Sequence, residues 1–210
     1  MSLEALDRLL EHPALWRGSG LARTSGLATG FSALDRCLPG GGWPHHGLIE
    51  ILSPCLGSGE LHLILPLLAA LSSKANGRWC AWIAPPHEPF APALALRGVA
   101  VERMLVVRTE EPLWAFEQAL GLGACELALA WPTRITTRHI QRLQLAAERG
   151  RALGVLFRGT SAARKSSPAM LRLIVEPLPQ GLRARLLKSR GGRHGWIVFS
   201  WNEVHALVSP

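Results

Sequence analysis

The stretch LIEILSPCLGSGELHLILPLLAAL, residues 48–71, decides the fold of this chain. An apolar run, Leu48–Leu52, enters a short turn rich in Ser, Pro and Gly, Ser53–Gly59, and a Leu-rich segment of helical character follows. This order of strand, tight loop and helix is the frame of a phosphate-binding loop. The alternative is an ordinary strand–loop–helix corner that happens to contain glycines.

The chemical groups of a working phosphate-binding loop are missing from this frame. A G-x-x-x-x-G-K-[ST] loop cradles phosphates with backbone N–H groups, reaches them with a Lys and holds Mg²⁺ with a hydroxyl. If Gly59 is the second glycine, Pro54 replaces the first. Glu60 then stands in place of the Lys, and Leu61 in place of the Ser or Thr.

A carboxylate at the lysine position opposes nucleotide binding. It repels a polyphosphate by about 4 kcal/mol per charge pair at about 4 Å, for an effective dielectric of about 20. We therefore expect a degenerate loop (Pro54, Gly57, Gly59, Glu60 and Leu61) that binds nucleotide poorly, with no cofactor and no metal. The carboxylate of Glu60 is expected to sit where a phosphate would.

The composition indicates one α/β domain. A chain of 210 residues with 48% hydrophobic content buries a full core. Its apolar stretches are broken before the roughly 18 residues that a membrane span needs, and the start MSLEALDRLLEH has no apolar signal region, so we expect a cytoplasmic protein. The four cysteines lack C-x-x-C spacing, so neither a disulfide nor a zinc site is expected.

The net charge of +8 is concentrated in the last third of the chain. Residues 1–133 hold 9 basic and 12 acidic side chains, whereas residues 134–210 hold 14 basic and 3 acidic ones. Such asymmetry indicates a surface for nucleic acid or for an acidic partner near the C-terminal part. An Arg-rich proteome is the alternative explanation.

The chain divides into an N-terminal helix and linker, residues 1–26, and a core, residues 27–210. In the core, strand-like runs alternate with helix-type segments, which indicates a mainly parallel sheet covered on both faces. The strand-like runs are Trp79–Ala84, Met104–Val107, Cys125–Trp131 and Ala152–Phe157. The helix-type segments are Glu60–Ser72, with a kink expected at Pro66, Ala91–Arg97, Leu113–Leu122, and Thr137–Arg149, with a Thr cap and Gly150 as its stop.

The pattern of alternating strands and helices ends at Phe157. Residues 158–168, RGTSAARKSSP, are predicted to form a basic, mobile loop in which Arg164 and Lys165 are candidate contacts for a partner or DNA. Three β-type runs then predict an antiparallel β-extension over residues 169–202. They are Met170–Val175, Leu182–Leu187 and Trp196–Trp201.

The turn between the last two runs gathers three cations. Lys188, Arg190 and Arg193 share one glycine-rich tip, KSRGGRHG, which is a natural contact for phosphate or carboxylate. A solvated hairpin tip without function is the alternative.

Several segments together carry a family resemblance. They are LDRCLPGGGWP (34–44), GSGELHLILPLLAAL (57–71), WCAWIAPP (79–86), GVLFR (154–158) and KSRGGR (188–193). In these segments the chain resembles the ImuA family, the RecA-like and SulA-like accessory proteins of inducible translesion DNA synthesis. The stretch TGFSALDRCLPGGGWPHHGLIEIL (29–52) also resembles the entry into the nucleotide-binding core of RecA-type recombinases. The resemblance implies a RecA-like core, that is, a degenerate P-loop NTPase fold.

The resemblance also implies a binding scaffold in place of an enzyme. The water-activating glutamate of the recombinases falls near Pro86 here, with Glu88 close by. Ala130 and Trp131 stand where a Walker B acid would end its strand. With the phosphate, metal and water-activating groups all gone, no catalytic apparatus remains.

The function implied is that of a non-catalytic accessory protein of SOS-induced translesion synthesis and mutagenesis. Its implied partners are RecA, an ImuB-type polymerase-like protein and an error-prone replicative-type polymerase, with DNA as a further candidate. The alternative is a SulA-like cell-division inhibitor that binds FtsZ, which residues 61–157 fit almost as well. The entry motif, residues 34–44, and the long basic β-extension favour the accessory role over this alternative. A true ATPase that tolerates Glu60 is the third class.

Overall fold

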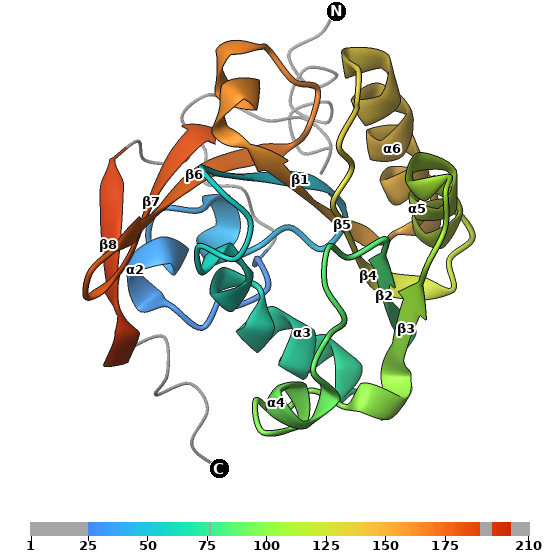
Figure 1. The fold of residues 1–210 in the computed structure, drawn as a ribbon, viewed down its shortest axis with the longest axis horizontal. Coiled ribbons are helices and arrows are strands. Elements are labelled where there is room, and N and C mark those ends of the chain that lie inside the picture. Colours follow the sequence, from blue (N-terminus) through green and yellow to red (C-terminus); the bar gives the residue numbers. More distant parts are fainter. Residues whose placement is uncertain (1–24, 76, 190–194, 203–210) are drawn as a thin grey trace, which may run out of the picture.

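A computed structural model describes residues 25–75, 77–189 and 195–202 (Figure 1). The predicted N-terminal helix and most of its linker lie outside the described residues, and so do Arg190 and Arg193. The division into residues 1–26 and 27–210 therefore stays a prediction.

One eight-stranded sheet, in the order β3-β2-β4-β5-β1-β6-β7-β8, forms the centre of the molecule. The strands are β1 (Gly47–Ser53), β2 (Trp79–Ile83), β3 (Met104–Val107), β4 (Cys125–Ala130), β5 (Leu153–Gly159), β6 (Leu171–Leu178), β7 (Gly181–Lys188) and β8 (Trp196–Ser200). Strands from β3 to β6 in this order pair in parallel, and β6-β7-β8 pair antiparallel. The predicted mainly parallel sheet with an antiparallel C-terminal extension is confirmed, and β6 joins the extension to β1.

Helices cover both faces of the parallel part (Figure 1). They are α2 (Ser32–Asp35), α3 (Leu65–Ser72), α4 (Ala91–Ala95), α5 (Pro112–Gly121) and α6 (Thr137–Gly150), with the 3₁₀ turns η1 (Pro39–Gly41), η2 (Glu60–Leu63), η3 (Val101–Arg103) and η4 (Thr160–Arg164). Helices α5 and α6 share one core cluster, and α2, α3 and α4 share the other. No helix in the described ranges is long and apolar enough to cross a membrane.

Strand β1 lies between the two cores, and all seven of its residues are buried. Successive side chains of a strand point to opposite faces. Leu48 therefore packs on the side of α5 and α6, whereas Ile49 and Ile51 pack on the side of α3. Burial on both faces explains why the strand is apolar from Leu48 to Leu52 apart from one residue, Glu50.

The Leu-rich segment after the loop is not the single kinked helix that the sequence predicted. The 3₁₀ turn η2 comes first, and α3 begins only at Leu65. Pro66 thus lies in the first turn of α3, where its missing N–H is not needed. A junction between two kinds of helix replaces the expected kink.

Helix α6 contains Gly150, which was expected to follow the helix as its stop. A Cβ at Gly150 would lie 1.9 Å from the carbonyl oxygen of Leu120 in α5. The glycine therefore permits the close contact between α5 and α6. It is the last residue of the helix, and Arg151 follows it as the C-cap, with φ 50°. The predicted Thr cap is confirmed: Thr136 Oγ1 accepts the backbone N–H of His139 at 3.3 Å.

Residues 158–168 are not the unstructured loop that the sequence predicted. Strand β5 continues through Arg158, and η4 follows it with Ala162 buried. The guanidinium of Arg172 donates to the carbonyl oxygens of Ala162 and Lys165, both at 2.9 Å. Contacts from β6 therefore order this segment.

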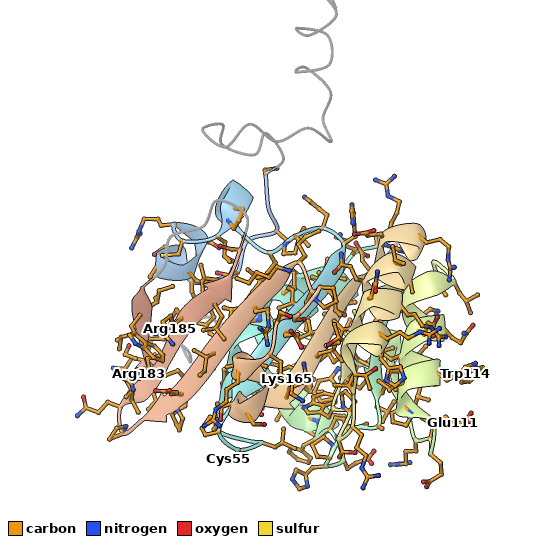
Figure 2. The ribbon with its side chains drawn as sticks, turned by 90° about the horizontal axis from the view of Figure 1, so that it is seen from above. Cys55, Glu111, Trp114, Lys165, Arg183 and Arg185 are labelled. Atoms are coloured by element: carbon orange, nitrogen blue, oxygen red, sulfur yellow. The ribbon has the colours of Figure 1, made fainter. Side chains whose placement is uncertain are left out.

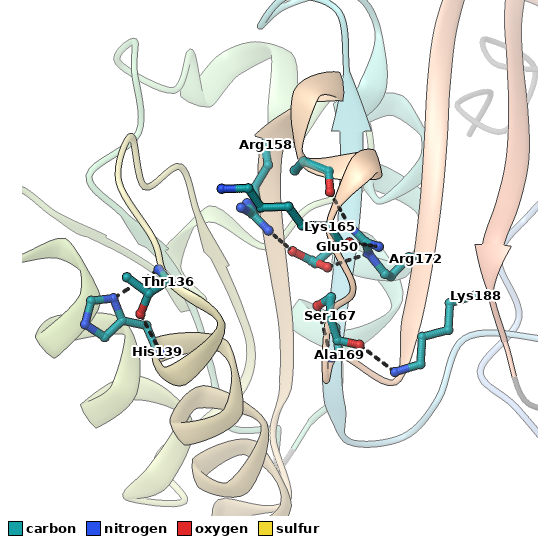
Figure 3. A network of polar contacts seen from close by, with 10 residues as sticks. Glu50, Thr136, His139, Arg158, Lys165, Ser167, Ala169, Arg172 and Lys188 are labelled. Carbon is teal, nitrogen blue, oxygen red and sulfur yellow. Dashed lines mark hydrogen bonds and ion pairs between the residues drawn. The ribbon is translucent and has the colours of Figure 1, made fainter.

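A buried carboxylate joins the two parts of the sheet (Figure 3). Glu50 of β1 is fully buried and forms ion pairs with Arg158 of β5 and Arg172 of β6. The Nε of Arg172 lies 2.7 Å from Glu50 Oε2, although its angle does not make it a regular hydrogen bond. We call these three residues the Glu50 cluster. It ties β5, β1 and β6 together beneath η4.

Replacing Glu50 should destabilise the protein strongly. Glu50→Ala is expected to lower the free energy of unfolding by about 3 to 5 kcal/mol, because Arg172 would stay buried without its counter-charge. The matched control is Glu117→Ala, which removes the surface ion pair with Arg142 and should cost less than about 1 kcal/mol. Urea unfolding of the two variants measures the difference. Equal losses would show that the cluster does not stabilise the sheet.

Candidate functional site

The loop that the sequence predicts to be a degenerate phosphate-binding loop, residues 54–59, lies between β1 and η2, at the carboxyl ends of the parallel strands. Gly57 and Gly59 have φ angles of 80° and 95°. These left-handed conformations suit glycine and strain other residues. The two glycines therefore fix the path of the loop.

The carboxylate of Glu60 turns back into this loop. Glu60 is 3% exposed. Its Oε1 accepts the backbone N–H of Gly57 at 2.8 Å, and its Oε2 accepts the hydroxyl of Ser58 at 3.2 Å. The chain's own anion thus satisfies a backbone donor of the loop.

The C-terminal extension packs against the loop. A Cβ at Gly59 would lie 2.6 Å from Leu182 Cδ2 of β7 and 3.0 Å from the ring of Trp201. The Trp201 ring also meets the His62 ring edge-on, with centroids 5.6 Å apart. The loop and the extension are therefore parts of one packed unit.

An apolar pocket of about 340 Å³ opens beside the loop. Most of its lining is leucyl, prolyl and aromatic: Leu56, Leu61, Leu65, Trp82, Pro85, Pro86, Pro89, Phe90 and Trp131. Two carboxylates line it, Glu60 and Glu88, against one guanidinium, Arg97. Such a lining suits an apolar group better than a polyphosphate.

Aromatic rings pack together at the end of β4, where a Walker B acid would be expected. Trp131 stacks on Phe157 with ring centroids 4.9 Å apart and an interplanar angle of 11°. Trp82 lies 5.4 Å from Trp131. Trp82 lies in β2, Trp131 directly follows β4 and Phe157 lies in β5, so their contact could not be read from the sequence. Tryptophans directly at strand ends were the available signal.

The structure brings some of the predicted contact residues together. The ammonium of Lys188, at the end of β7, donates to the carbonyl oxygen of Ser167 at 2.7 Å (Figure 3). Arg164 and Lys165 are exposed at the end of η4, two to three residues before Ser167. One basic region therefore spans η4 and the end of β7.

The cysteines of the described core are free thiols. Cys55 is exposed in the degenerate loop. Burial raises the pKa of the Cys80 thiol to about 12, with smaller increases from Glu126 and Cys125. Burial also raises the pKa of Cys125. Because only the thiolate is reactive, Cys80 and Cys125 are inert near neutral pH.

Comparisons with known proteins place the chain in a family. Residues 57–154 match the family model of the cell division inhibitor SulA. A cell division inhibitor SulA of Edwardsiella piscicida is 33% identical over 118 residues, which cover 54% of this chain and 69% of that protein. The chain belongs to the SulA family. The protein ImuA of Caulobacter vibrioides is 29% identical over 201 residues, covering 82% of each chain, so this member is an ImuA/SulA-like protein. The expected resemblance is confirmed.

The SulA match covers part of the chain. It begins within the loop, at Gly57, and ends in β5, so β1 and the extension lie outside it. A crystal structure of SulA from Pseudomonas aeruginosa, 28% identical, covers 52% of this chain and 96% of that one, with a TM-score of 0.45. The similarity to ImuA covers 82% of this chain, more than the SulA family model or the SulA crystal structure covers.

Two glycines of the loop allow a matched stability test. Both Gly57→Ala and Gly59→Ala place an alanine at a left-handed φ, which costs about 1 to 2 kcal/mol. Only Gly59→Ala also meets Leu182, so we expect it to lose about 1 to 3 kcal/mol more in urea unfolding. Adding Leu182→Ala to Gly59→Ala should remove that extra loss in a double-mutant cycle. Equal effects of the two single substitutions would contradict the packing of the extension on the loop.

Proposed function

We propose that this chain is a non-catalytic accessory protein of SOS-induced translesion DNA synthesis and mutagenesis. In this proposal a RecA-like core with a degenerate phosphate-binding loop serves as a docking platform. The observation that carries the proposal is the carboxylate of Glu60, which is buried within the loop and accepts the N–H of Gly57. It occupies the place that a phosphate would need.

Other groups of the site support the absence of catalysis. Trp131 stacks on Phe157 where a metal-binding acid would stand. Glu88, the nearest candidate for activating water, is exposed and paired with Arg108. Phosphoryl transfer uses a Lys and a metal at the phosphates. The described residues that line this pocket include no Lys, and their one guanidinium, Arg97, shares the pocket with two carboxylates, Glu60 and Glu88.

The proposed partners follow the likeness to ImuA, which covers 82% of each chain. They are RecA, an ImuB-type polymerase-like protein and an error-prone replicative-type polymerase, with DNA as a further partner. The proposed contacts are the basic residues Lys188, Arg190, Arg193, Arg164 and Lys165. The N-terminal segment, residues 1–26, is proposed as a second docking element.

A SulA-like inhibitor of cell division that binds FtsZ is the second candidate function. It is favoured by the match of residues 57–154 to the SulA family model. The extension β6-β7-β8, which lies outside that match, favours the accessory role instead. Filamentation of cells that overproduce the chain would favour inhibition of division.

The loop predicts a negative result with nucleotide. Titration of the purified chain with Mg-ATP in a calorimeter should give no binding at micromolar concentrations, because Glu60 repels the phosphates and already holds the loop donor. Glu60→Gln removes the charge and serves as a comparison. Micromolar binding by the unaltered chain, or ATP hydrolysis that is lost in Gly59→Ala, would overturn the non-catalytic assignment.

Reversing the charge of the tip should disrupt partner binding. A triple variant, Lys188→Glu, Arg190→Glu and Arg193→Glu, is expected to retain at least tenfold less of the proposed partners in a pull-down from DNA-damaged cells. Nuclease treatment of half the lysate separates protein contacts from those made through DNA. The matched control is Arg36→Glu, Arg134→Glu and Arg138→Glu, which changes the same charge on exposed residues outside the tip. Wild-type retention by the tip variant would show that the tip is not the contact.

A further inference from the structure

None of the helices that the structure describes covers one face of the extension, β6-β7-β8. In β7 and β8, Leu182, Ala184, Ile197 and Phe199 are buried in the core with α2 and α3. The alternate residues therefore point to the side of α5 and α6. Those two helices cover only the parallel part, and Figure 2 shows the strands that bear Arg183 and Arg185 uncovered on this side.

The strand register places two cations beside an exposed aromatic ring. Two rows cross β6, β7 and β8: Ile174, Arg185 and Trp196, and next to it Glu176, Arg183 and Val198. Trp196 is 40% exposed and Val198 is 62% exposed. We call Arg183, Arg185, Trp196 and Val198 the arginine–tryptophan face.

Both guanidinium groups lie against the indole ring. The Cζ of Arg183 is 4.3 Å from the ring centroid of Trp196, and that of Arg185 is 5.0 Å from it. The Nε of Arg183 donates a hydrogen bond to Glu176 Oε2 at 2.8 Å. Arg185 forms no ion pair with any residue that the structure describes. A guanidinium that stacks on a ring keeps the N–H donors at its edge available for phosphate.

The surroundings of the face are positively charged. Besides the two arginines, the exposed side chains of Arg164, Lys165 and Lys188 lie on η4 and at the end of β7. Glu176 is the one acidic side chain among the described residues of η4 and β6–β8. The face is therefore complementary to an extended anion.

We propose that the arginine–tryptophan face binds single-stranded nucleic acid. Single strands offer repeated phosphates to the cations and unpaired bases to an aromatic ring, and both kinds of group are present here. A duplex hides the faces of its bases and would leave Trp196 unused. An acidic peptide would meet the cations, but its Asp and Glu side chains carry no aromatic ring to stack on the indole. This inference deepens the proposed function, in which DNA is one partner, and it assigns the contact to residues outside the tip.

Fluorescence anisotropy of the full chain with a labelled oligothymidylate of about 20 nucleotides tests the proposal. Arg183→Ala with Arg185→Ala should weaken binding at least tenfold and reduce the slope of log K against log salt by about 1.4, at roughly 0.7 per phosphate contact. Trp196→Ala should weaken binding several-fold at every salt concentration, and Trp196→Phe should restore most of it. The control Arg134→Ala with Arg138→Ala removes the same charge and should change neither value.

A result that contradicts the proposal shows that the arginine–tryptophan face binds a different ligand or none. Absence of binding by the unaltered chain, or equal effects of the two double variants, would overturn the proposal. Tighter binding of a duplex of the same length, or complete displacement of the oligonucleotide by polyglutamate at equal charge concentration, would overturn it in favour of duplex or of an acidic protein. If a double variant fails to fold, Arg185→Ala alone decides, because that side chain forms no ion pair with a described residue. The assay contains no protein partner, so its failure leaves the accessory role untouched.

Discussion

The pairing of one carboxylate with two guanidinium groups holds this fold together. Glu50 lies on β1, the strand that pairs with β5 of the parallel part on one side and with β6, the first strand of the C-terminal extension, on the other. Backbone pairing between β1 and β6 extends over four residue pairs, which makes a narrow seam. The Glu50 cluster reinforces that seam from one face, and Arg172 also holds the carbonyls of η4. A buried charge stays tolerable only with its counter-charges, so these residues depend on one another.

The second constraint links the degenerate loop to the extension. Glu60 supplies the anion within the loop, and Leu182 and Trp201 close against Gly59 from outside. The loop therefore has a defined shape without any ligand. In the proposed function this rigidity is an advantage, because a docking surface that is already ordered loses less conformational entropy when a partner binds.

Much of the fold could be predicted from the sequence, because burial on both faces produces unbroken apolar strands and periodic helices. Met104–Val107 was predicted to the residue, and the β-extension was placed correctly. The failures share one cause: they depend on contacts distant in sequence. Arg158 and Glu50 are 108 residues apart, so nothing local revealed that residues 158–168 are ordered. The loss of the phosphate-binding residues from the loop could be recognised from the local sequence. The contact between the rings of Trp82, Trp131 and Phe157, which come from three different strands, could not.

The edge strands of the sheet are short. Strand β3 has four residues and β8 has five, although Leu105, Val106 and Val198 expose apolar surface there. An outer strand carries a row of unpaired backbone N–H and C=O groups that can template the addition of a foreign strand. With so few residues at either border, such addition would gain few hydrogen bonds. The short edge strands thereby protect the sheet against edge-to-edge aggregation, even though they expose apolar side chains.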